Sequence, residues 1–146
     1  MAKAKAAKET GRVLVVDDET NMRRTLADIL RNEGYEVATA ATGEEAVQRC
    51  SEADYDIVLM DVRMPGMDGV EAFRRIRRHQ EGVRVILMSA YSMEDLKHAA
   101  LDEGAIAFLT KPLDLDQAVR LISEVKDTAI LVVRTTSAFR RPCKPG

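Results

Sequence analysis

The chain has 146 residues, of which 46% are hydrophobic and 32% charged, with a formal net charge of -2 at pH 7. This length suits one domain with a single core, and the composition excludes a disordered or fibrous chain. The small net charge excludes a global field that gathers nucleic acid or anionic membrane, and no apolar run approaches the roughly 18 residues of a membrane span.

The cysteines and the N-terminus indicate the compartment. Cys50 and Cys143 are far apart in the sequence and form no CxxC pair, so neither a disulfide framework nor a zinc site is predicted. This usage is typical of a reducing compartment, and we expect a cytoplasmic protein. Residues 1–10 are positively charged but contain no apolar segment, which predicts a solvated arm rather than a secretory signal.

Short apolar runs recur along the chain and predict five strands. Four runs are continuous, as is typical of parallel strands covered on both faces, whereas the segment 35–40 alternates and predicts an edge strand. In chain order the predicted strands are 13–16, 35–40, 57–60, 85–88 and 105–109.

Helical patterns lie between and after the strands, so five helices are expected. The helix near residues 92–101 offers only Leu96 and alanines for burial and is predicted to be the most loosely held. Gly34, Gly82 and Gly104 lie where helices are expected to end. The other four apolar stripes consist of Met22, Leu26, Ile29 and Leu30; Ala46, Val47 and Cys50; Val70, Phe73 and Ile76; and Leu115, Ala118, Val119, Ile122 and Val125.

Strict alternation of strands and helices implies an α/β fold with a mostly parallel sheet and right-handed crossovers. In such sheets ligands bind outside the carboxyl ends of the strands. Those ends carry three carboxylates, a hydroxyl and an ammonium here: Asp17, Asp18, Asp61, Ser89 and Lys111.

This set of side chains predicts phosphoryl chemistry at a metal site. Neighbouring carboxylates raise one another's pKa, and a hard cation such as Mg²⁺ relieves the repulsion. A carboxylate can then attack an activated phosphoryl group and form an aspartyl-phosphate. We predict Asp61 as the nucleophile and also as a metal ligand, and Asp17 and Asp18 as metal-holding residues. Ser89 and Lys111 are expected to bind the phosphoryl oxygens.

Four separated motifs, in order, resemble the receiver domain of a bacterial two-component response regulator: Asp17-Asp18, "LMDVRMPGMDG", "ILMSAY" and "FLTKPLD". The resemblance extends from about Arg12 to Lys126. It implies a flavodoxin-like, doubly wound five-stranded parallel sheet in the order 2-1-3-4-5 with five helices. It also implies a phosphorelay switch that accepts a phosphoryl group on Asp61, with Mg²⁺, from a sensor histidine kinase or a histidine phosphotransfer protein. Slow self-dephosphorylation, rather than enzymatic turnover, is implied as well.

The resemblance assigns further roles. The backbone carbonyl of Arg63 is implied as the third protein ligand of the metal, and a cis peptide bond is implied between Lys111 and Pro112. Ser89 would move toward the phosphoryl group while Phe108 rotates inward. The face formed by the fourth helix, fifth strand and fifth helix would then change what it binds, which is a downstream effector domain or protein.

Several motifs also have a purely structural interpretation. Asp18 before Glu-Thr-Asn is a plausible helix cap, and "MPGMDG" is a turn followed by a helix start. The basic run at 74–79 is interpreted as a solvated helix face, because Ile76 belongs to the apolar stripe and no aromatic residues are interleaved. No direct nucleic-acid binding by this domain is therefore expected.

Two other classes of function remain open on the residues alone. A phosphatase or phosphotransferase of the aspartyl-phosphate type needs a substrate pocket and usually a cap domain, for which the chain has little spare length. A pseudo-receiver would be a docking module that never accepts phosphate. A stand-alone transcription factor is disfavoured, since neither an output domain after residue 127 nor a basic recognition helix is visible.

The expected organisation is an arm at 1–10, a receiver domain at 11–127 and a tail at 128–146. The tail aligns with the opening of the chain, with 131–133 on 14–16 and 140–141 on 23–24. It resembles the truncated start of a second receiver, although a chance match between apolar runs is the alternative. An unpartnered apolar strand can pair with another chain, so a homodimer is a further hypothesis.

Overall fold

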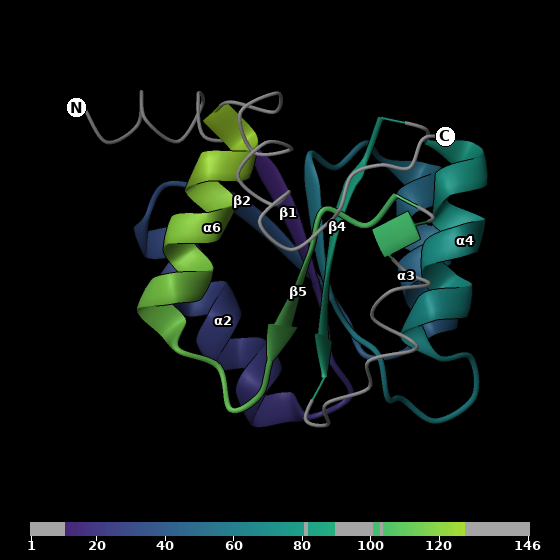
Figure 1. Cartoon of the computed structure of the whole chain (residues 1–146), viewed down its shortest axis with the longest axis horizontal. Helices are drawn as coiled ribbons and strands as arrows, with labels where there is room; N and C mark the ends of the chain where they lie inside the picture. The colour runs from purple at the N-terminus through teal and green to yellow at the C-terminus, as the bar shows by residue number, and fades with distance from the viewer. Residues whose placement is uncertain (1–10, 81, 90–100, 103, 128–146) are drawn as a thin grey trace.

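The computed structural model describes residues 11–80, 82–89, 101–102 and 104–127, which form three layers (Figure 1). Helices α2 (Thr20–Asn32) and α6 (Leu115–Asp127) cover one face of a central sheet. Helices α3 (Gly43–Glu52) and α4 (Gly69–His79) cover the other. None of the helices within these described ranges is long and apolar enough to cross a membrane.

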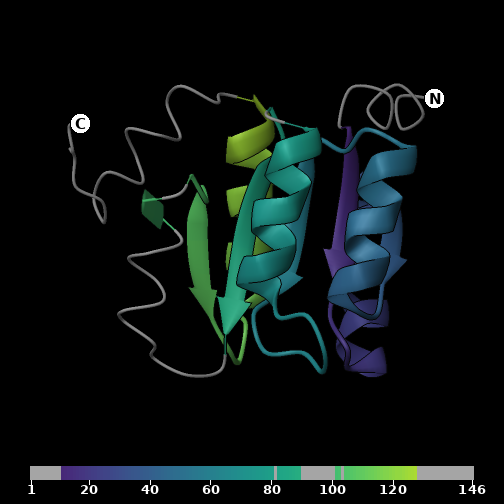
Figure 2. The ribbon, with the colours of Figure 1, turned by 90° about the vertical axis from the view of Figure 1, so that its right-hand side faces the viewer.

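The sheet has five parallel strands in the order β2-β1-β3-β4-β5, as predicted, and Figure 2 shows the arrows running the same way. Strand β2 lies at an edge, which agrees with its alternating sequence. The strands are β1 (Arg12–Val16), β2 (Glu36–Ala40), β3 (Ile57–Asp61), β4 (Arg84–Ser89) and β5 (Ala107–Thr110).

The core has two halves, one on each face of the sheet. Alternate residues of a strand point to opposite faces, so Val13 packs with α2 and α6 whereas Leu14 packs with α3 and α4. Every residue of β3 is buried. Burial on both faces explains why the central strands are continuous apolar runs.

Three predicted segments lie outside the described residues: the arm at 1–10, the tail at 128–146 and the helix near 92–101 up to residue 100. Leu101, together with Asp102, is helical. Strand β5 begins at Ala107, two residues later than predicted, after Gly104 with a φ of 111°. Gly34 has a φ of 101°, but Gly82 has no positive φ because α4 has already ended at His79.

The starts of α4 and α2 show whether "MPGMDG" and Asp18 have the structural roles considered above, a helix start and a helix cap. Asp68 caps α4 by accepting a hydrogen bond from the Glu71 N–H at 2.9 Å, so "MPGMDG" is indeed a helix start. At α2 the N-cap position is Glu19, without a side-chain hydrogen bond, so Asp18 is not a cap. The Asp17 carboxylate instead accepts a hydrogen bond from the Glu19 N–H at 2.9 Å.

Helix α3 begins with reciprocal capping bonds. The Glu45 N–H donates to the Thr42 hydroxyl oxygen at 3.0 Å, and the Ala41 N–H donates to a Glu45 carboxylate oxygen at 2.9 Å. The bond from Ala41, together with Arg49, holds the pKa of Glu45 below its ordinary value against the opposing effect of partial burial. The carboxylate is therefore stabilised in the folded state.

Because the folded pKa of Glu45 is depressed, its charge stabilises the fold above the unfolded pKa, and this contribution is lost as the pH falls through the folded pKa. We expect Glu45→Gln to lower the midpoint of thermal unfolding near neutral pH. The difference in unfolding midpoint between Glu45→Gln and wild type should vanish at a pH well below about 4, where Glu45 is protonated in both the folded and the unfolded state. Glu33→Gln, an exposed change, is the control; a pH-independent difference for Glu45→Gln would contradict the expectation.

Candidate functional site

The carboxyl ends of the parallel strands meet at one edge of the sheet, the lower edge in Figure 2. Asp17 follows β1, Asp61 ends β3, Ser89 ends β4 and Lys111 follows β5. The topology thus brings together residues that are up to 94 positions apart in the sequence.

Lys111 links two buried carboxylates. Its Nζ lies 2.8 Å from Asp17 Oδ2 and 3.2 Å from Asp61 Oδ2. Asp17 is fully buried, Asp61 is 5% exposed, and the Lys111 side chain is 15% exposed. The second oxygen of Asp17 accepts the Glu19 N–H, so this carboxylate is held at both oxygens.

Asp18 completes a cluster of three carboxylates. One ligand oxygen from each of Asp17, Asp18 and Asp61 lies within 4.8 Å of the others. Two of the three residues are buried and Asp18 is exposed, so the cluster is open to solvent on one side. An all-oxygen donor set that leaves room for water matches the preference of Mg²⁺.

The three carboxylates of this cluster carry more negative charge than the single neighbouring ammonium of Lys111 can neutralise. Burial, and then the charge of Asp17, raise the pKa of Asp61 against the opposing effect of Lys111. Burial lowers the pKa of Lys111, but its hydrogen bond to Asp17 and the charges of Asp17 and Asp61 outweigh this, and the net shift is upward. One ammonium therefore faces three carboxylates, and a divalent cation would restore the balance.

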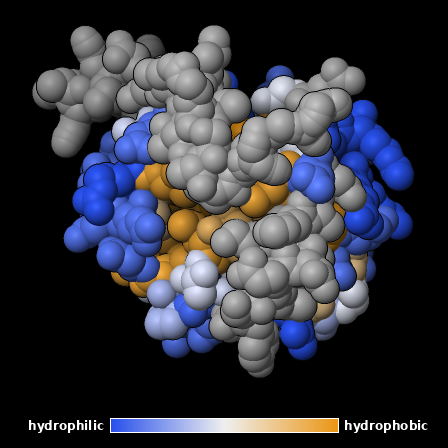
Figure 3. Space-filling view, in the orientation of Figure 1, coloured by the Kyte–Doolittle hydropathy of each residue, from blue (hydrophilic) through white to orange (hydrophobic). Residues whose placement is uncertain are grey.

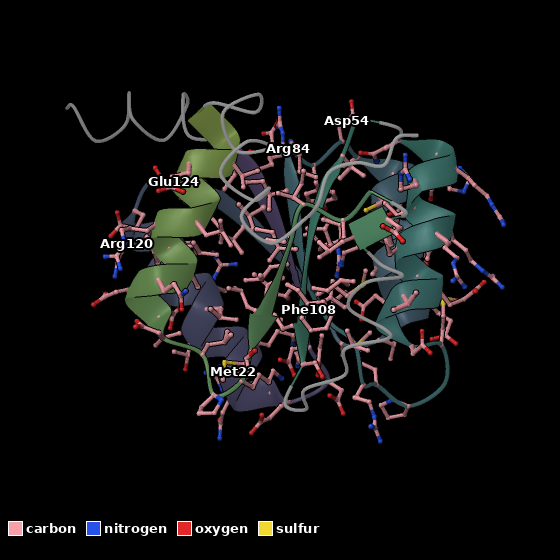
Figure 4. The ribbon with its side chains drawn as sticks, viewed as in Figure 1. Met22, Asp54, Arg84, Phe108, Arg120 and Glu124 are labelled. Carbon is pink, nitrogen blue, oxygen red and sulfur yellow. The ribbon has the colours of Figure 1, made fainter. Side chains whose placement is uncertain are left out.

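The remaining predicted residues lie along the same edge. Ser89 is fully buried, and its carbonyl accepts a hydrogen bond from the Lys111 N–H at 2.7 Å. Phe108, labelled on β5 in Figure 4, is half-buried and packs against the core beneath α3 and α4. The peptide bond between Lys111 and Pro112 is cis, as predicted. Arg63 is exposed in the loop after β3, and its carbonyl as a ligand stays a prediction.

Arg23 borders the site, and the sequence pattern gave no signal for it. Its Nη1 donates a hydrogen bond to the Asp17 carbonyl oxygen at 2.7 Å. The guanidinium comes from the first turn of α2 and holds the backbone at the end of β1. A long side chain of this kind has too many accessible directions to be placed from spacing alone.

In metal-free buffer, Asp61→Asn is expected to raise the free energy of unfolding by on the order of 1 kcal/mol. A neutral amide is less costly to bury beside Asp17 than a carboxylate. Chemical denaturation in the presence of a chelator measures the change, with Asp28→Asn on the exposed side of α2 as the control. An unfolding free energy equal to or below that of wild type would show that the clustered charges do not destabilise the fold.

A doubly wound parallel sheet in this order, with carboxylates and a partly buried lysine at its carboxyl edge, defines a CheY-like domain with a flavodoxin fold. Residues 13–123 match the response regulator receiver domain family, and the chain belongs to this family. It is a phosphorylation-activated switch domain of two-component signalling.

Relatives of known function support this membership. CheY of Thermotoga maritima is 39% identical over 115 residues, which are 78% of this chain and 96% of that protein. The regulatory protein AtoC of Escherichia coli is 42% identical over 106 residues, which are 73% of this chain and 23% of AtoC. The chain thus spans about a quarter of the length of AtoC and of the transcriptional regulatory protein ZraR of Klebsiella oxytoca.

Solved structures agree with the fold. A CheY-like receiver domain protein from Methanospirillum hungatei has a TM-score of 0.77 at 30% identity, covering 80% of this chain and 93% of that one. The response regulator TrrA from Thermotoga maritima, solved with Mg²⁺-BeF, has a TM-score of 0.69 at 37% identity. That match covers 78% of this chain and 97% of TrrA.

Proposed function

We propose that Asp61 is the phosphoacceptor of this receiver domain. The observation that carries the proposal is the position of the Asp61 carboxylate, which is in contact with the Lys111 ammonium and in one cluster with Asp17 and Asp18. The cluster opens to solvent at Asp18, where a phosphodonor can approach.

Asp17, Asp18, Asp61 and the Arg63 carbonyl would hold Mg²⁺. Bound there, the cation supplies positive charge to the oxygens of the phosphoryl group. Three of the four ligands are the clustered carboxylates, whose excess negative charge favours binding. Related structures are consistent with this role, since TrrA was solved with Mg²⁺-BeF and the receiver domain of the Pseudomonas aeruginosa kinase PA1611 with magnesium in its active-site cleft.

Asp61, Lys111 and Ser89 have different roles in the proposed phosphoryl transfer. An Asp61 oxygen forms a bond to phosphorus while the nitrogen–phosphorus bond of a phosphohistidine breaks. The electron pair returns to the imidazole nitrogen, which takes a proton from solvent. Lys111 and Ser89 donate hydrogen bonds to the phosphoryl oxygens, and water later hydrolyses the aspartyl-phosphate slowly. The domain is thus a regulator that promotes its own phosphorylation rather than a turnover enzyme.

The readout is proposed to run through Ser89 and Phe108. Ser89 would move toward the phosphoryl group and Phe108 would rotate inward, which alters the face around β5 and α6 and the helix predicted near 92–101. Apolar residues are visible in the middle of the face shown in Figure 3, between the polar outer sides of α6 and α4, as suits a protein partner.

The partners are proposed by analogy with the relatives. We propose a sensor histidine kinase or a histidine phosphotransfer protein as the donor and an effector domain or protein as the target. The names of AtoC and ZraR describe regulatory proteins, and each is longer than this chain. Residues 11–127 are proposed as the receiver unit, in the cytoplasm, without direct nucleic-acid binding of its own. Pairing through the tail at 128–146 would give a homodimer.

Intact-mass spectrometry after incubation with acetyl phosphate tests the function. The protein is expected to gain the mass of one phosphoryl group when Mg²⁺ is present, and the gain should disappear when a chelator is added. A folded, Mg²⁺-binding protein that gains no mass would favour a docking module that does not accept phosphate. Continuous release of phosphate from a small phosphoester at enzyme-like rates would favour a phosphatase.

A further inference from the structure

The loop at 62–68 connects Asp61 to α4 and is fastened at both ends. The Val62 N–H donates to the Met88 carbonyl at 2.8 Å, which ties the start of the loop to β4. The Gly69 N–H donates to the Val62 carbonyl, also at 2.8 Å, which closes the loop on itself. Arg63 lies between these two bonds, so its carbonyl depends on the path of the whole loop.

The middle of the loop lies against the first residue of α3. A Cβ atom at Gly43 would lie 2.7 Å from the Met67 carbonyl oxygen and 3.2 Å from the Met67 Cβ. The first of these distances is shorter than real Cβ contacts, and the opposing atom belongs to the backbone. Only glycine therefore allows α3 and the loop to approach this closely.

A second glycine, Gly66, lies inside the loop at 62–68 and determines its backbone path. Gly66 has a φ of 78°, in the left-handed region that side chains rarely adopt. A Cβ there would lie 3.2 Å from a carboxylate oxygen of Glu44, which is the second residue of α3. Both glycines lie where the start of α3 meets the loop, Gly43 in the helix and Gly66 in the loop.

The loop also reaches the backbone of Asp61 directly. A Cβ atom at Gly69, the first residue of α4, would lie 2.3 Å from the Asp61 carbonyl oxygen, so the start of α4 packs closely on the Asp61 backbone. We expect a Cβ atom at Gly43 to displace Met67 and, with it, the neighbouring residues between Asp61 and Gly69.

We propose that Gly43 and Gly66 are positioning residues for the metal site, because they hold the loop at 62–68 against the start of α3. This inference rests on the proposed function, in which Asp61 and the Arg63 carbonyl are ligands. Mg²⁺ demands near-ideal octahedral geometry at about 2.0–2.1 Å, so a shift of a few tenths of an ångström in two ligands weakens its binding. Neither glycine touches the proposed ligands.

Isothermal titration with Mg²⁺ tests the proposal on the full chain. Gly43→Ala is expected to raise the dissociation constant by about 10-fold, the lower end of what supporting groups contribute at metal sites. The Mg²⁺ concentration for half-maximal phosphorylation by acetyl phosphate should rise in parallel, while the rate at saturating Mg²⁺ changes less than twofold. Gly82→Ala is the matched control, since a Cβ there meets nothing within 4 Å and its φ is not positive.

Each outcome decides the question. A Gly43→Ala protein that binds Mg²⁺ like wild type, even with a lower unfolding midpoint, would overturn the proposal and leave a structural role only. If Gly43→Ala does not fold, Gly66→Ala decides by the same titration, and unchanged affinity would overturn the proposal. Wild type that binds no Mg²⁺ would instead refute the proposed function. Asp18→Asn lacks one proposed ligand and is titrated in parallel, so that it gives the titration signal of a protein whose metal site is lost. A wild-type signal equal to that of Asp18→Asn identifies this case.

Discussion

Replacing Lys111 with methionine is expected to slow phosphoryl uptake from acetyl phosphate by about 100-fold, the cost of removing one electrostatic stabiliser from a phosphoryl or oxyanion site. The ammonium lies between Asp17 and Asp61, so it is already in place when a phosphoryl group arrives. Methionine is unbranched and only one atom shorter than lysine, and it removes the charge. Mg²⁺ binding should be retained, because the carboxylates lose a competing cation.

The rate of mass gain at saturating Mg²⁺ measures this effect, and titration with Mg²⁺ measures binding separately. Arg120→Met is the control, since Arg120 is an exposed cation on the outer side of α6 (Figure 4). Uptake by Lys111→Met within twofold of wild type would exclude Lys111 from the transfer step. Loss of Mg²⁺ binding in the same variant would show that the lysine supports the fold of the cluster instead.

Phe73→Ala is expected to lower the free energy of unfolding by about 3–5 kcal/mol, as for other buried aromatic residues. Phe73 is fully buried on α4 and belongs to the half of the core beneath α3 and α4. Its removal is expected to leave a cavity, because surrounding structure relaxes only partially after such a change. Since domains of this kind are stable by only about 5–15 kcal/mol, the loss is a large part of the total.

Urea denaturation at fixed Mg²⁺ concentration measures this loss. His79→Ala, at the exposed end of the same helix, should change stability by less than about 0.5 kcal/mol. A decrease in unfolding free energy of less than about 1 kcal/mol for Phe73→Ala would mean that packing of the Phe73 side chain in the core does not hold α4 on the sheet.

The sheet was predictable because the burial of each strand is reflected in its own run of apolar residues. Residues 57–60 form a continuous apolar run, and all of β3 is buried between the two helix layers. The clustering of the candidate site residues was predictable for a topological reason, since the residues that follow parallel strands lie at one edge of the sheet. Lys111 and Asp17 therefore meet at 2.8 Å although 94 positions separate them.

Contacts between elements that carry no periodic signal could not be predicted. The approach of Gly43 to the Met67 carbonyl depends on how α3 and the loop after β3 pack, and neither sequence segment specifies the other. The hydrogen bond from Arg23 to the Asp17 carbonyl is similar, because it depends on one rotamer of a long side chain. Gly82 was expected to lie at the end of a helix, but the helix before it ends earlier, at His79, and Gly82 has no positive φ.

Trapping the phosphoryl group tests the central claim most directly. After incubation with acetyl phosphate and Mg²⁺, borohydride reduces an aspartyl-phosphate to homoserine, and peptide mass mapping locates the reduced residue. The expected result is homoserine at position 61 and none in Asp61→Asn or in a chelator-treated sample. Homoserine at Asp17 or Asp18 instead, or at no residue of a protein that gains phosphoryl mass, would contradict Asp61 as the acceptor.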